Sequence, residues 1–234
     1  MKLIRKGHGH AHRGVIGVES AIVMIAFVIV AAALAFVVLN MGFSTTQKAK
    51  TTIISGLGEA SSSLEIAGKV TGIQDAGSTS QLAVLSVPIK IAPGGDAVNL
   101  ANTTASIKYL SNSVEYDDIY TGALTEQAPS NVTVAWEWAK TYVCGASCYP
   151  NPVNDTTNYN DGTQAIIYWT VGSGNAILDQ GEHAVVSIAY DRASPDDRPS
   201  ALDKVRAEIL LPTGSPLTIE RDVPNITTTV VDLG

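Results

Sequence analysis

The amino-acid sequence predicts an α+β protein, in which a long hydrophobic helix at the amino terminus precedes an antiparallel β-sandwich. A run of 19 residues without one polar side chain stands near the amino terminus, and none of the ten prolines occurs before Pro88. Alternating apolar stretches separated by Gly and Pro turns fill the rest of the chain. Since proline breaks helices and alternation is typical of half-buried strands, these observations separate a helical part from a strand-rich part.

The charge balance excludes a nucleic-acid binder. The net charge of the chain is −7, but residues 1–14 hold four bases and no acid. The remaining 11 bases stand against all 22 acids, which gives residues 15–234 a net charge of −11. A nucleic-acid binder needs many closely spaced basic residues, because they displace the counterions of the phosphates. With two cysteines in the chain and one histidine beyond residue 14, most metal and thiol chemistry lacks its ligands, so we expect neither an enzyme nor a cofactor.

The basic segment of residues 1–14 leads directly into the apolar run, Ala21–Leu39. As a helix this run is roughly 28 Å long, close to the hydrocarbon core of a bilayer. A secretory signal peptide fits less well, because its apolar region is shorter and ends at a small-residue cleavage site. A cut after Arg13-Gly14 would remove the basic leader and keep the hydrophobic helix.

The helical pattern continues past the apolar run. Apolar or small residues recur at spacings of three and four as far as Ala67, which predicts a continuous helix from about Ile16 to Val70. At roughly 80 Å, such a helix is too long to pack along one domain of ordinary size. We therefore expect its partners to be copies of itself, with Val28 and Phe36 at the core of that assembly.

The rest of the chain is rich in Val, Ile, Thr, Tyr and Trp, and breakers divide it into about eight short strands, as in an antiparallel β-sandwich. In the third of them, Trp136 and Trp138 are expected on one face, in the core. The predicted strands are Leu82–Ile91, Thr104–Leu110, Val132–Val143, Gln164–Val171, His183–Tyr190, Lys204–Leu211, Leu217–Val223 and Ile226–Val231.

Residues 13 to about 70 resemble the amino terminus of archaeal flagellins (archaellins), the subunits of the archaellum filament. The matching features are Arg13-Gly14, the apolar stretch, Gly17 and Glu19, and the polar residues after Phe43. Two later stretches also look family-like: one from Ile177 to Glu182 and one from Leu211 to Arg221.

The resemblance implies a rotating motility filament and a route by which the chain reaches it. A membrane prepilin peptidase of the type IV pilin class would cut between Gly14 and Val15. The chain would wait in the cytoplasmic membrane until the archaellum assembly machinery, which is similar to a type IV pilus machine, builds it into an extracellular polymer. That polymer would be a homo-polymer or would include other archaellins. Residues 1–14 would then be the leader, 15–70 the filament-core helix, and 71–234 an immunoglobulin-like outer domain.

Glu19 has two interpretations. A carboxylate in an apolar helix is costly to insert unless it lies near the interface or is paired. It therefore either sits at the headgroup boundary or, by similarity to type IV pilins, pairs with the new amino group of a neighbouring Val15 during assembly. We favour the role in assembly.

Four Asn-x-Thr sequons fall in the predicted outer domain, at Asn102, Asn131, Asn154 and Asn225. By resemblance to archaellins, which are commonly N-glycosylated, an oligosaccharyltransferase would modify them. Asn154 has the most loop-like context. Cys144 and Cys148 are too few for a zinc site, so in an oxidising exterior a disulfide is favoured over a reduced pair.

Two other classes of protein share part of this pattern. An archaeal adhesion-type IV pilin would have the same leader and helix but build a different filament. A membrane-anchored extracellular binding protein would not polymerise, and the apolar stripe that continues beyond the reach of a bilayer argues against it.

Overall fold

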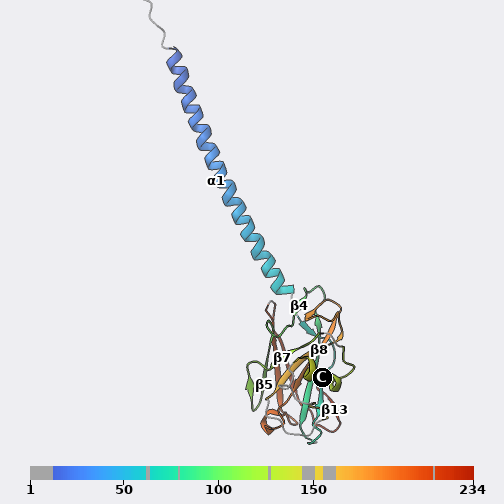
Figure 1. The fold of residues 1–234 in the computed structure, drawn as a ribbon. Coiled ribbons are helices and arrows are strands. Elements are labelled where there is room, and N and C mark those ends of the chain that lie inside the picture. Colours follow the sequence, from blue (N-terminus) through green and yellow to red (C-terminus); the bar gives the residue numbers. More distant parts are fainter. Residues whose placement is uncertain are drawn as a thin grey trace, which may run out of the picture. The chain divides into compact units, whose positions relative to one another are not determined.

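The computed structural model describes residues 13–61, 64–78, 80–125, 128–143, 151–154, 162–212 and 214–234 (Figure 1). The chain divides into two compact units, residues 1–55 and 56–234, and each is described by itself. The expected α+β architecture, with one long apolar helix followed by β-sheets, is confirmed.

The amino-terminal helix α1 spans Arg13–Ser61, or 49 residues, which corresponds to about 73 Å. It is shorter than the predicted helix, which was wrong in continuing to Val70. Residues Leu64–Ile66 form strand β1 and pair with residues 89–91 of β3 (Leu82–Ile91). The sheet satisfies the backbone hydrogen bonds of these residues and buries Leu64. The helical spacing of apolar residues in the sequence beyond Ser61 therefore does not correspond to a helix in the structure.

Two main sheets build the β-domain. In the seven-stranded sheet the order is β13-β2-β3-β10-β8-β7, with β1 beside one end of β3. In the four-stranded sheet the order is β12-β11-β5-β6, and β4 and β9 form a separate pair. The strands not yet bounded are β2 (Thr71–Gln74), β4 (Val98–Asn99), β5 (Ser106–Ser111), β6 (Glu115–Tyr116), β7 (Tyr120–Leu124), β8 (Gln164–Val171), β9 (Ile177–Leu178), β10 (His183–Ala189), β11 (Lys204–Leu210), β12 (Leu217–Asp222) and β13 (Val230–Asp232).

The larger core is built by alternate residues of both main sheets. Ile89 and Val186 from the large sheet belong to the same buried cluster as Ile107 and Ala207 from the small one. The two layers of a sandwich are therefore present. Within the described residues, the strand pairs are antiparallel except β7 with β8, which run parallel, so the sandwich is mixed at that position.

A second helix was not predicted. Residues Val132–Tyr142 form α2, whereas their alternating pattern had predicted a strand as far as Val143. The Asn131 side chain caps α2 by accepting a hydrogen bond from the Val134 backbone N–H at 2.9 Å. The prediction was wrong because the decisive spacing is helical: Ala135, Trp136 and Ala139 lie on one face and are fully buried.

This face of α2 packs in a second core cluster, which also contains Ile166 and Tyr168 of β8. The Trp136 indole N–H donates to the Ser187 hydroxyl of β10 at 2.9 Å. Trp138, two residues on, points to a different side of the helix and is only half-buried, so the two tryptophans do not share a face as predicted. Because helix and sandwich core cover both faces of β8, residues 165–169 are buried without alternation.

The other predicted strands agree with the structure to within two residues at each end, except the last. The shorter strands β1, β2, β4, β6, β7 and β9 were not predicted. Residues 226–231 were expected to form it, but β13 begins only at Val230 and pairs with Ile73 of β2. Val231 and Leu233 are buried, and Leu233 donates its backbone N–H to the Val70 carbonyl. Buried and exposed side chains therefore alternate over residues 230–234, and these residues form the end of the sheet rather than residues 226–231.

Candidate assembly helix and surface sites

The described side chains of α1 between Gly17 and Leu57 are all exposed. Val28 is 66% exposed and Phe36 67%, although both belong to the apolar stretch. This part of the helix is long and apolar enough to cross a membrane, with a mean hydropathy of 3.3 in its most apolar window. Since large exposed apolar surfaces mark sites of association or membrane contact, α1 is the first candidate functional site.

The residues expected to take part in processing and assembly all belong to α1, and those of the expected cleavage site lie at its start. Gly14 and Val15 belong to its first turn. Glu19 lies one turn further on and is exposed, and within the described residues it forms no ion pair. The structure brings Glu19, Val28 and Phe36 onto one helix but supplies no intrachain partner among the described residues for any of them.

The polar part of α1 satisfies its own hydroxyl groups. The hydroxyls of Thr45 and Thr46 donate to backbone carbonyls four residues earlier, each at 2.8 Å. Those of Thr51 and Thr52 donate to the Lys48 carbonyl at 2.9 Å. A polar helix segment with internally paired hydroxyls is less costly to remove from water. The sequence had shown a polar segment here but not this pairing.

Two of the four sequon asparagines have structural roles. Asn131 caps α2 through its side-chain oxygen. Asn102 is exposed in a turn, and its side-chain nitrogen, the atom to which a glycan would be attached, donates to the Thr121 carbonyl at 3.3 Å. Both side chains are therefore held by the fold.

The other two sequon asparagines, Asn154 and Asn225, are also exposed. Asn154 closes a turn by donating its backbone N–H to the Asn151 carbonyl, and Asn225 lies between β12 and β13. Cys144 and Cys148, expected as a disulfide, lie outside the described residues, as do the second and third residues of the Asn154 sequon.

Glu182 connects two turns, a role that sequence reasoning missed although it had noted the segment Ile177–Glu182. Its carboxylate accepts backbone hydrogen bonds from Ser173 at 2.7 Å and from Asp179 at 3.0 Å. Burial acts to raise the pKa of Glu182, but the hydrogen bonds from Asp179 and Ser173 outweigh it and lower this pKa below its ordinary value. The turn from Asp179 to Glu182 contains Gly181 at a φ of 93°, which favours glycine.

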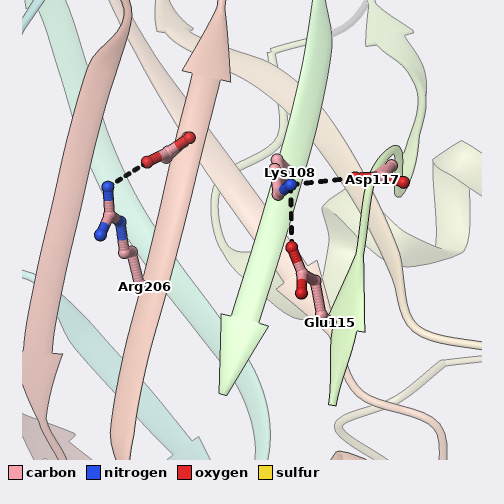
Figure 2. Close-up of polar contacts among 5 residues, drawn as sticks. Lys108, Glu115, Asp117 and Arg206 are labelled. Atoms are coloured by element: carbon pink, nitrogen blue, oxygen red, sulfur yellow. Dashed lines mark hydrogen bonds and ion pairs between the residues drawn. The ribbon is translucent and has the colours of Figure 1, made fainter.

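The outer face of the four-stranded sheet carries paired charges (Figure 2). The Lys108 ammonium lies 2.9 Å from both Glu115 and Asp117, and Arg206 pairs with Glu208. The hydrogen bond to Glu115 and then that to Asp117 raise the pKa of Lys108 above its ordinary value. A depression of about 230 Å³ lies among Lys108, Leu110, Arg206 and Glu208. Its charges are compensated locally, as is common on a solvated surface.

Within the part of the chain that the structure describes, no group of three or more His, Cys, Asp or Glu side chains is arranged to hold a metal ion.

Comparison with known proteins gives one consistent family. Residues 14–221 match the archaeal-type flagellin family. The chain is 34% identical over 212 residues to probable flagellin 1 of Aeropyrum pernix, which covers 91% of this chain and 92% of that protein. It is 26% identical over 221 residues to probable flagellin 2 of Archaeoglobus fulgidus, with 91% and 90% covered.

Two solved structures share the fold. The archaeal flagellum of Methanospirillum hungatei is matched over 89% of this chain and 93% of that chain, with a TM-score of 0.53 and 23% identity. The crystal structure of flagellin FlaB1 from Methanocaldococcus jannaschii is matched over 73% and 95%, with a TM-score of 0.52 and 16% identity. Since the family match extends from the first turn of α1 to β12, the chain belongs to the archaeal-type flagellin family.

Proposed function

We propose that this chain is a structural subunit of the archaellum that polymerises through α1 into a motility filament. The observation that carries the proposal is the exposed apolar surface of a helix much longer than a bilayer requires. Family membership supports it, as does the shared fold with a chain of the Methanospirillum hungatei flagellum. The function is that of a structural protein at the cell surface.

The length of the apolar helix favours two successive environments. Residues 17–57 extend about 62 Å as a helix, whereas a hydrocarbon core is about 30 Å thick. The membrane therefore covers only part of this surface while the precursor waits there. Identical helices packed side by side cover all of it, with Val28 and Phe36 inside the bundle.

Processing would precede assembly. A prepilin peptidase would remove residues 1–14 by cutting between Gly14 and Val15, and the archaellum assembly machinery would extract the mature chain from the membrane. The cut takes away the four bases of the leader but leaves nearly the whole of α1, including Glu19. The remaining helix keeps the apolar surface needed for polymerisation.

The β-domain would form the outer coat. Its charged sheet face and four exposed sequon asparagines suit a surface that stays in contact with water. An oligosaccharyltransferase would add glycans there, which increase hydrophilic bulk. Archaellins of other kinds would be able to join the same filament through equivalent helices.

Isolation of surface filaments tests the proposal. Filaments sheared from cells that express this chain should contain it with Val15 as its first residue, and their abundance should follow swimming. Filaments that contain the chain but do not rotate would indicate an adhesion pilus. A chain that stays in the membrane while cells swim normally, or one that begins at Met1 in filaments, would contradict the proposal.

A further inference from the structure

Three charged side chains lie on the described, exposed part of α1 between Gly17 and Leu57. They are Glu19, near the start of the helix, and Lys48 and Lys50, near its end. None of them forms an ion pair within the described residues. If the apolar faces of this helix are enclosed by its copies, a charge that stands on such a face without a partner would strongly oppose assembly, so its partner must come from another copy.

The two lysines stand on different faces. Residues three and four positions apart share a helix face. Lys50 therefore shares its face with Ile53 and Ile54, whose side chains are 61% and 56% exposed. Lys48 shares its face with Thr51 and Thr52, whose hydroxyls are bound to the helix backbone. Of these two faces, the Lys50 face is the one that combines a charge with an exposed apolar surface.

Glu19 lies on a face of the same kind. Three and four residues after it come Ile22 and Val23, which are 61% and 54% exposed. The face Glu19-Ile22-Val23 thus repeats the spacing of Lys50-Ile53-Ile54 with the opposite charge. Two copies brought together at these faces would pair the charges and cover four branched apolar side chains.

The angular positions allow this contact in a polymer of parallel helices. Glu19 and Lys50 are 31 residues apart, which places them about 220° apart around the axis and about 46 Å apart along it. They point to nearly opposite sides, as the two halves of a head-to-tail contact must. Lys48 points within about 20° of Glu19 and cannot face back toward a neighbour in the same way.

We propose that Glu19 of one copy pairs with Lys50 of a second copy displaced by about 46 Å along the filament, with Ile22 and Val23 against Ile53 and Ile54. This inference rests on the proposed function and names the contact by which α1 polymerises. The pairing explains why an acid stands inside the apolar helix and why apolar residues follow Lys50 beyond the reach of a bilayer.

Charge reversal tests the pairing in cells whose only filament subunit is this chain. Lys50→Glu should lower the mass of sheared filaments about tenfold or more, because two carboxylates then face each other. Lys48→Glu, the matched control two residues away, should change it less than about twofold. Glu19→Lys should assemble as poorly as Lys50→Glu, and the double variant Glu19→Lys/Lys50→Glu should restore most of the filament mass.

Each variant is also measured as membrane-held chain, which separates failed assembly from failed production. Normal filaments from Lys50→Glu, equal losses from both lysine variants, or a double variant no better than the single ones would overturn the pairing. In those cases Glu19 serves another partner, such as the amino group of Val15, and the proposed function stands. Absence of filaments from the unaltered chain would overturn the proposed function itself.

Discussion

Leu64 is the register partner of Ile91 in the antiparallel pair of β1 and β3, only three residues after the last residue of α1. Leu64 is 7% exposed and Val70 is fully buried, and both belong to the larger core. Residues 64–70, which the sequence had assigned to the helix, are therefore part of the β-domain.

The position of this boundary predicts how truncated chains behave. Residues 64–234 should fold cooperatively as a soluble, strand-rich protein. Residues 72–234 lack β1 and the buried side chains of Leu64 and Val70. They should therefore be less stable by several kcal/mol, since each lost aliphatic side chain costs about 2–5 kcal/mol. Thermal unfolding followed by circular dichroism compares the two, and equal melting temperatures would contradict the boundary at Leu64.

A buried carboxylate supports the loop that follows β10. Asp75 is 4% exposed, pairs with Arg192, and accepts a hydrogen bond from Arg198 at 2.9 Å. Asp75→Asn removes the buried carboxylate that both guanidinium groups contact and should lower the free energy of unfolding of residues 64–234 by about 3–5 kcal/mol. Denaturant unfolding measures this loss.

An exposed ion pair provides the control for Asp75. Lys69 and Asp232 pair on the surface, with side chains that are 76% and 46% exposed. Asp232→Asn should therefore lower the free energy of unfolding far less than Asp75→Asn does. If the two substitutions cost the same, the buried cluster around Asp75 does not hold the loop.

Glu182 predicts a pH dependence of stability. Its pKa is lowered in the folded state because its backbone hydrogen bonds favour the ionised form more than burial opposes it. This contribution is fully present above the pKa of the unfolded chain and is lost as the pH falls through the folded value. At neutral pH, Glu182→Gln should cost about 1–3 kcal/mol, and the difference from the unaltered domain should shrink in acid. Glu137→Gln, on the exposed face of α2, is the control for the substitution itself and should cost less at neutral pH than Glu182→Gln.

The sequons should differ in occupancy. Asn131 is held as a helix cap, whereas Asn154 stands exposed in a turn. We expect Asn154 to carry a glycan and Asn131 to carry less or none. In mass spectra of filament protein, Thr156→Ala should remove one glycan mass, while Thr133→Ala should leave the spectrum of glycan masses nearly unchanged. The reverse pattern would show that local hydrogen bonding does not govern modification.

Most of the β-domain followed from alternation and breakers, because its strands bury one face and expose the other. Residues 82–91 and 164–171 formed the strands predicted for them. Residues 132–142 did not, since Val-Thr-Val-Ala-Trp-Glu-Trp satisfies the strand pattern while Ala135, Trp136 and Ala139 also satisfy a helical one. Two features favour the helix over the strand: the Asn131 cap, and the apolar face of the large sheet that α2 covers. Only the cap is visible in the sequence.

The long helix was predictable in existence but not in extent. Leu64 continues the helical spacing of apolar residues, yet a strand of the sheet offers it burial that an exposed helix does not. Whether residues 64–66 form a helix or a strand thus depends on residues 89–91, with which they pair in the sheet and which are distant in the sequence. For the proposed assembly contact, the charges of Glu19 and Lys50 were visible in the sequence. The proposal that they pair between copies also needed the structure, in which both residues lie on exposed faces of α1.

Val28→Asp tests the central claim, that α1 is the core of the polymer, most directly. Val28 is 66% exposed on α1, and Val171 at the end of β8 is 58% exposed, so Val171→Asp is a matched control. The measurement is the mass of filaments sheared from cells, relative to the chain held in the membrane. Val28→Asp should reduce this ratio about tenfold or more, because the new carboxylate is enclosed without a partner, and Val171→Asp should leave it nearly unchanged. Normal filaments from Val28→Asp would contradict the claim.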